Sequence, residues 1–73
     1  MKISARNILA GKVVAVEKGM TTAHVRIEIA KGVVITASIT NEAVDDLELK
    51  VGDQASAIIK ASSVLVGKVR VRC

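Results

Sequence analysis

Hydrophobic and polar residues alternate along most of the chain. Between Thr22 and Ile29 every second residue is apolar, and the residues between them are threonine, histidine, arginine and glutamate. Successive side chains of a β-strand point to opposite faces, so this pattern predicts a strand with one buried face. Gly19 and Gly32 separate this run from its two neighbours and can adopt the positive φ of a tight turn, which predicts two hairpins. The five runs that predict strands cover residues 12–17, 22–29, 33–39, 54–60 and 63–71.

The segment 40–49 departs from this alternation and predicts a short helix. Thr40 or Asn41 is suited to the N-cap position, and the carboxylates that follow suit the positive end of a helix dipole. Val44 and Leu47 lie three positions apart, so we expect them to close one end of a barrel. Five short strands with one helix after the third is the order of an OB-like barrel. The predicted fold is therefore all-β: an OB-like five-stranded barrel with one short helix between the third and fourth strands.

The length of 73 residues predicts one domain spanning residues 1–73. A chain this small hides only about 60% of the surface of its unfolded state, so it needs further support. Cys73 is the only cysteine, which excludes an internal disulfide, and no set of residues shows the spacing of a metal site. Hydrophobic residues make up 51% of the chain without a single aromatic one. We therefore predict a homo-oligomer whose subunit contacts bury the remaining aliphatic surface.

The net charge of the chain and its expected cellular compartment limit the kinds of partner that it can bind. The N-terminus lacks the apolar region of a signal peptide, and no run is long enough to span a membrane, so we expect a cytoplasmic protein without a membrane partner. The net charge of +4 favours anionic partners, either small ions or nucleic acid. Residues 67–73 form a basic C-terminal extension in which Lys68, Arg70 and Arg72 alternate with valines. Such a pattern is also typical of a solvated strand face.

The sequence offers little material for catalysis. It contains one histidine, His24, and one cysteine, Cys73, and they are 49 positions apart. His24 falls on the polar face of an alternating strand, where an exposed or interface histidine is the simpler interpretation. We therefore expect a binding protein and not an enzyme.

Two short segments are rich in hydrogen-bond donors. Residues 3–7 read Ile-Ser-Ala-Arg-Asn and residues 58–62 read Ile-Ile-Lys-Ala-Ser, and neither contains a carboxylate. Each places a cation and a hydroxyl two positions apart, with a small alanine between them. Such a set suits an anion that carries no proton, such as molybdate or tungstate, better than hydrogen phosphate, which also needs an acceptor. Ordinary strand ends are the alternative, because serine beside a basic residue is common.

Several motifs resemble those of the molbindins, the Mop-type molybdate-binding proteins of the TOBE/Mop domain family. They are the opening Met-Lys-Ile-Ser-Ala-Arg-Asn, the Ile35-Thr36-Ala37 run, Leu47-x-Leu49-x-x-Gly52 and Ile59-Lys60-Ala61-Ser62. The resemblance covers residues 1 to about 66. It implies an OB-like barrel assembled as a hexamer, a trimer of dimers, that stores molybdate at subunit interfaces for molybdenum homeostasis. No organic cofactor is implied.

The resemblance also assigns residues to sites. The positions that match the oxyanion-binding motifs are Ser4, Ala5, Arg6, Asn7, Lys60, Ala61 and Ser62. A second class of oxyanion site, built largely from backbone amides, is expected at the turn formed by Gly19, Met20, Thr21 and Thr22.

A single-stranded nucleic-acid-binding protein with an OB-like barrel is the alternative function. The net charge and the predicted fold favour it. The absence of aromatic residues opposes it, because such barrels usually stack bases on aromatic side chains.

Overall fold

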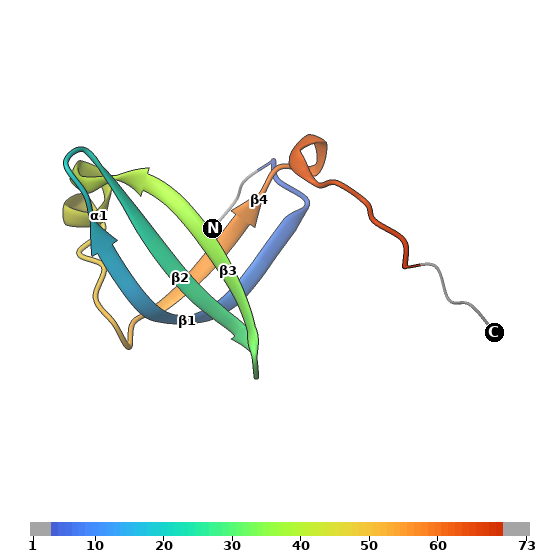
Figure 1. Ribbon diagram of the computed structural model, residues 1–73, viewed down its shortest axis with the longest axis horizontal. Helices are drawn as coiled ribbons and strands as arrows, with labels where there is room; N and C mark the ends of the chain where they lie inside the picture. The colour runs from blue at the N-terminus through green and yellow to red at the C-terminus, as the bar shows by residue number, and fades with distance from the viewer. Residues whose placement is uncertain (1–3, 70–73) are drawn as a thin grey trace.

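Four antiparallel strands form one curled sheet in the computed structural model, which describes residues 4–69 (Figure 1). The strands follow the order β3-β2-β1-β4 across the sheet. The two predicted hairpins, β1–β2 and β2–β3, are confirmed. The elements in chain order are β1 (Asn7–Lys18), β2 (Thr22–Ala30), β3 (Val33–Thr40), α1 (Asn41–Asp46), β4 (Gln54–Ile59) and the 3₁₀ turn η1 (Ala61–Ser63).

Strand β1 gives the sheet its curl. Its first half, from Asn7 to Lys12, pairs with β4, and its second half, from Lys12 to Lys18, pairs with β2. The register shifts between Val13 and Ala15, and such a bulge bends a strand and increases its twist. The strand starts five residues before the predicted 12–17, because β4 supplies a partner for the earlier residues. The bent strand thereby connects β4 to the part of the sheet formed by β2 and β3 (Figure 1).

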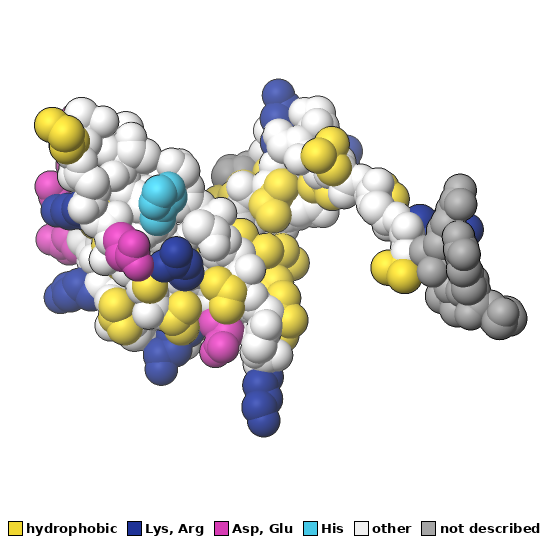
Figure 2. Space-filling model, viewed as in Figure 1, with side chains coloured by type: hydrophobic (Ala, Val, Ile, Leu, Met, Phe, Trp, Pro, Cys, Tyr) yellow, Lys and Arg dark blue, Asp and Glu magenta, His cyan; other side chains and the backbone are white. Residues whose placement is uncertain are grey.

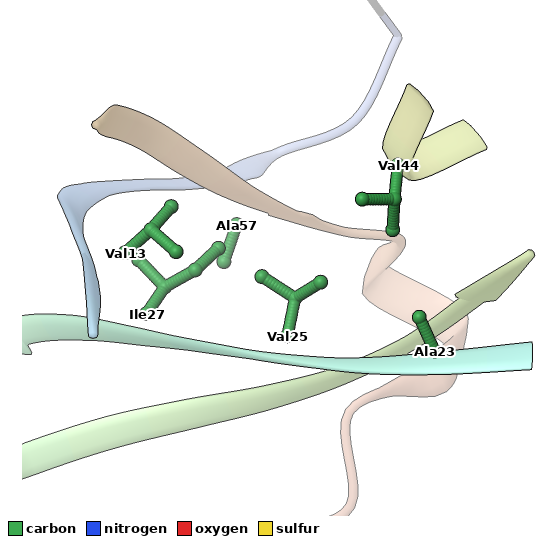
Figure 3. Packing of buried hydrophobic residues seen from close by; sticks show 6 residues of the cluster. All are labelled: Val13, Ala23, Val25, Ile27, Val44 and Ala57. Carbon is green, nitrogen blue, oxygen red and sulfur yellow. The ribbon is translucent and has the colours of Figure 1, made fainter. Parts of the chain in front are cut away.

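A small aliphatic core lies inside the curl (Figure 3). The alternation predicted for 22–29 is confirmed, since the apolar side of β2 faces this core. Val44 of α1 closes one end with 3% of its surface exposed, as predicted. Leu47 does not, because the helix has ended and Leu47 is its C-cap, with 66% exposed. The buried residues are Val13, Ala23, Val25, Ile27, Val44 and Ala57.

Helix α1 covers 41–46 and is shorter than the predicted 40–49. Thr40 is the N-cap, and its hydroxyl accepts a hydrogen bond from the backbone N–H of Ala43 at 3.0 Å. Glu48, the residue after the C-cap Leu47, has a positive φ of 51°. The N–H of the next residue, Leu49, then donates back to the carbonyl of Val44 at 3.1 Å. This left-handed residue reverses the chain toward β4.

The predicted fifth strand over 63–71 is not formed in the part that the structure describes. Ser63 belongs to η1, residues 64–69 lie in no strand, and residues 70 and 71 fall outside the described range. After η1 the chain runs away from the sheet (Figure 1), so it meets no strand edge with which to pair. The all-β, OB-like class is confirmed, with four strands in residues 4–69.

Candidate anion-binding site

The first strand begins beside the point where the last strand ends, and this brings the two donor-rich segments together. Asn7 is the register partner of Ile59, so the residues before Asn7 and those after Ile59 leave the sheet at the same end. Asn7 and Ile59 themselves are 52 positions apart in sequence. The structure therefore places the Ser-Ala-Arg and Lys-Ala-Ser motifs side by side.

These segments line a pocket of about 620 Å³. Its wall holds two cations, two hydroxyls and no carboxylate, and its one large apolar side chain is that of Ile58 in β4. Neither cation takes part in the two ion pairs formed within residues 4–69. A wall of this composition favours an anion. The lining residues are Ser4, Ala5, Arg6, Ile58, Lys60, Ala61 and Ser62.

Local backbone structure shapes the second side of the pocket. Lys60 precedes η1 in an extended conformation, and its carbonyl accepts a hydrogen bond from the N–H of Ser63 at 2.8 Å. No side chain caps the start of this turn. Ala5 and Ala61, whose side chains are single methyl groups, also line the pocket. Backbone N–H groups can therefore add to the side-chain donors.

Six of the seven residues predicted for this site line the pocket, and Asn7 is the exception. Its amide Nδ2 instead donates to the carbonyl oxygen of Ile59 at 3.2 Å, in a partly buried position. Ile58 is the lining residue that sequence reasoning missed. Alternation along 54–60 places it on the outward face, where 47% of it is exposed.

The turn Gly19–Thr22, predicted as a second oxyanion site, lies at the other end of the sheet, beside α1 (Figure 1). The N–H of Gly19 donates to the carbonyl of Thr22 at 2.8 Å, so this amide is already engaged. Asn41 holds the turn twice, with its side chain on the carbonyl of Gly19 and its backbone N–H on that of Thr21, both at 2.9 Å. Met20 at the tip is fully exposed.

A second groove of about 420 Å³ runs beside α1, and sequence reasoning did not find it. It contains the lysines Lys18 and Lys50 and the carboxylates Asp45 and Glu48 over an apolar floor. Lys18 and Asp45 form an ion pair across it. Because its charges balance, this groove lacks the excess of donors found at the other end.

Other chemistry has little support in the described residues. His24 is exposed, as predicted, and lies opposite Glu17 and Ser38 in the sheet register. Within residues 4–69 no three histidine, cysteine or acidic side chains gather where they could hold a metal ion. No helix formed by these residues has the length and hydropathy needed to cross a membrane.

Comparison with known proteins gives a family match over nearly the whole chain. A family model described as the TOBE domain matches residues 3–66. A probable molybdenum-pterin-binding protein of Haemophilus influenzae is 54% identical over 67 residues, which cover 92% of this chain and 97% of that protein.

Solved structures show the same architecture. A molybdate-binding protein from Sporomusa ovata superposes with a TM-score of 0.87 at 40% identity, covering 93% of this chain and all of the other. The cytoplasmic molybdate-binding protein ModG, solved with molybdate bound, gives a TM-score of 0.85 at 48% identity. That match covers 89% of this chain and 46% of ModG.

Proposed function

The chain belongs to the TOBE domain family, and we propose that it binds molybdate in the pocket between residues 4–6 and 58–62. The observation that carries this proposal is the composition of the pocket wall, which has two cations and two hydroxyls but no carboxylate. The names of the similar proteins support the choice of ion, because they describe proteins that bind molybdate or a molybdenum pterin.

Each lining residue has a role in this proposal. Arg6 and Lys60 offset the double negative charge of the ion. Ser4 and Ser62 donate hydrogen bonds to its oxygens through their hydroxyl or amide groups. Charge-assisted bonds of this kind are shorter and stronger than neutral ones, so the two cations contribute most of the affinity.

The protonation state of the ion explains the selectivity that we expect. Molybdate and tungstate carry no proton near neutral pH and need only donors. Hydrogen phosphate carries a proton, which would face a wall without a carboxylate acceptor. Tungstate therefore remains an alternative ligand, whereas sulfate, which has the same charge but is smaller, is distinguished by size.

We further propose that the protein is a homo-oligomer, a hexamer built as a trimer of dimers, with ions held at subunit interfaces. A pocket of about 620 Å³ is far larger than one tetrahedral ion, so a second surface is needed to exclude water from the site. Aliphatic side chains are also exposed on the sheet and on the extended chain after η1 (Figure 2). Leu65 and Val66 each expose 93% of their surface, more than an isolated chain tolerates easily.

In the cell we propose storage of molybdate in the cytoplasm for molybdenum homeostasis, in a single domain without catalytic activity. ModG, a similar protein, is described as cytoplasmic. The turn Gly19–Thr22 is the proposed second oxyanion site. This turn lies far along the sheet from the first pocket (Figure 1). Because the Gly19 N–H is already engaged, its remaining backbone donors would combine with those of other subunits.

Native mass spectrometry tests the proposal directly. The protein is measured alone, with molybdate and with the same concentration of sulfate. We expect a hexamer that gains several molybdate ions and no sulfate. A competition series with tungstate then ranks the two larger ions.

Two controls separate this function from its alternatives. Single-stranded nucleic acid is added at several salt concentrations, because nucleic-acid binding weakens steeply with salt. A monomer that gains no molybdate but binds single strands would replace the oxyanion proposal by the nucleic-acid one. A hexamer that takes up molybdate and sulfate equally would contradict the proposed selectivity.

A further inference from the structure

We infer that Asn7 is a positioning residue that holds the two sides of the anion pocket together and does not contact the ion. This inference rests on the proposed function, because it concerns the same pocket. It assigns to Asn7 a role that differs from that of its neighbours in the Ser-Ala-Arg-Asn motif.

The position of Asn7 in the sheet determines which way its side chain points. Ile8 and Ile58 form a register pair, and both are about half exposed on the outer face, where Ile58 lines the pocket. Side chains alternate between faces along a strand. Asn7 and Ile59, the adjacent pair, therefore point to the other face, which agrees with their lower exposure. The side chain of Asn7 is thus turned away from the pocket wall.

The side chain of Asn7 forms a hydrogen bond that connects β1 to β4. Its Nδ2 donates to the carbonyl oxygen of Ile59 at 3.2 Å, between the first residue of β1 and the last residue of β4. Beyond this pair the two segments leave the sheet. The bond is therefore the last side-chain link between them before the pocket begins.

Two positive charges lie next to this hydrogen bond, one on each segment. Arg6 immediately precedes Asn7, Lys60 immediately follows Ile59, and both cations line the pocket. Two like charges repel each other while no anion lies between them, and the repulsion acts to separate the segments that carry them. A hydrogen bond at the base of both segments opposes this separation. The empty pocket then keeps the spacing that the ion requires, which lowers the cost of binding.

The test compares Asn7→Ala with Thr40→Val in the full chain. Thr40→Val also removes one side-chain hydrogen bond to the backbone, the cap on Ala43, but at the α1 end of the sheet. Both variants are examined without the ion by amide hydrogen exchange. Molybdate affinity is then measured by calorimetry.

We expect Asn7→Ala to accelerate exchange in residues 4–8 and 58–62 without the ion, and to weaken molybdate binding about fivefold. A fivefold change corresponds to about 1 kcal/mol, the net contribution of one intramolecular hydrogen bond. Thr40→Val should accelerate exchange around α1 and the adjoining Gly19–Thr22 turn, leave exchange in residues 4–8 and 58–62 unchanged, and weaken molybdate binding less than Asn7→Ala does.

Three results would overturn the inference. Weaker binding without faster exchange would mean that Asn7 contacts the ion. Faster exchange with unchanged affinity would mean that the link serves stability alone. An equal loss of affinity in both variants would indicate a general effect of stability. If the wild-type protein ignored molybdate, the proposed function would fail, while the ion-free exchange would still show whether Asn7 orders the two segments.

Discussion

Gly11 of β1 lies directly against the backbone of Glu28 in β2. A Cβ atom at position 11 would come within 2.9 Å of the carbonyl carbon of Glu28 and within 2.9 Å of Cγ2 of Ile27. The contact falls where β1 changes its partner from β4 to β2, shortly before the bulge between Val13 and Ala15. The absence of a side chain at position 11 therefore allows the two strands to approach each other at the bend.

Gly11→Ala should consequently destabilise the fold. The added methyl group meets backbone, which cannot move aside without disturbing the pairing of β1 with β2. Forcing extra atoms into a packed site typically costs about 1–3 kcal/mol, and we expect a loss in that range. Urea denaturation checks it. Gly67→Ala is the matched control, because nothing lies within 4 Å of that position. An equal effect of both substitutions would contradict the close contact at Gly11.

A substitution at Glu48 should instead increase the stability of the protein. Its φ of 51° is in the left-handed region, where a side chain is unfavourable and glycine is not. Glu48→Gly should therefore stabilise the protein by about 0.5–1 kcal/mol, the balance between relieved strain and the greater entropy of an unfolded glycine. The midpoint of thermal unfolding measures it. Glu48→Ala, which keeps the Cβ, should give no such gain, and equal stabilisation by both would point to the lost charge instead.

The cap of α1 gives a third prediction. The hydroxyl of Thr40 accepts the N–H of Ala43, a donor that has no partner within the helix. Thr40→Ala should cost about 1 kcal/mol of unfolding free energy, as is typical when an N-cap oxygen is lost. Thr40→Ser keeps the oxygen and should lose much less. A chemical denaturation series on the three proteins decides it, and similar losses for alanine and serine would assign the effect to the methyl group of threonine.

Local signals in the sequence were sufficient for much of the fold. The alternation in 22–29 identified the buried side of β2, and Thr40 was correctly expected near the helix start. These features depend on neighbouring residues. The end of α1 was not predictable in the same way, because Glu48 takes a conformation that glycine or asparagine usually signals.

Features that depend on residues far apart in the chain could not be predicted from the sequence. The early start of β1 at Asn7 needs β4 as a partner, and that register places Arg6 beside the Lys60 segment. The donor content of both segments was visible beforehand, but the role of Asn7 was not, since its bond to Ile59 exists only in the paired sheet. The run after Ser63 has the composition of a strand and lacks a partner edge within the described chain.

The exposed run after η1 leads to a prediction about assembly. Replacing Leu65 and Val66 together by lysine removes apolar surface that a single chain leaves in solvent. If this run lies in a subunit interface, buried lysines without partners will prevent association, and the protein should be monomeric with its sheet intact. Sedimentation velocity gives the mass, and circular dichroism shows the fold. Val51→Lys, at a side chain that is 66% exposed on the turn before β4, is the control. A double variant that keeps the wild-type mass would place the interface elsewhere.

Lys60 is the residue on which molybdate binding should depend most clearly. It lines the pocket, forms no ion pair within residues 4–69, and in our proposal faces a doubly charged ion. Removing one partner of a buried charge pair typically costs about 2–5 kcal/mol, so Lys60→Ala should weaken molybdate binding about thirtyfold or more while the sheet still forms. Lys31→Ala is the matched control, because Lys31 is an exposed lysine in the β2–β3 turn. Each variant lowers the net charge by one. Calorimetric titration of both therefore separates the loss of a side chain that binds the ion from the effect of the lower net charge. Unchanged affinity in Lys60→Ala would remove Lys60 from the site, and equal losses in both variants would mean that the ion responds only to the overall positive charge.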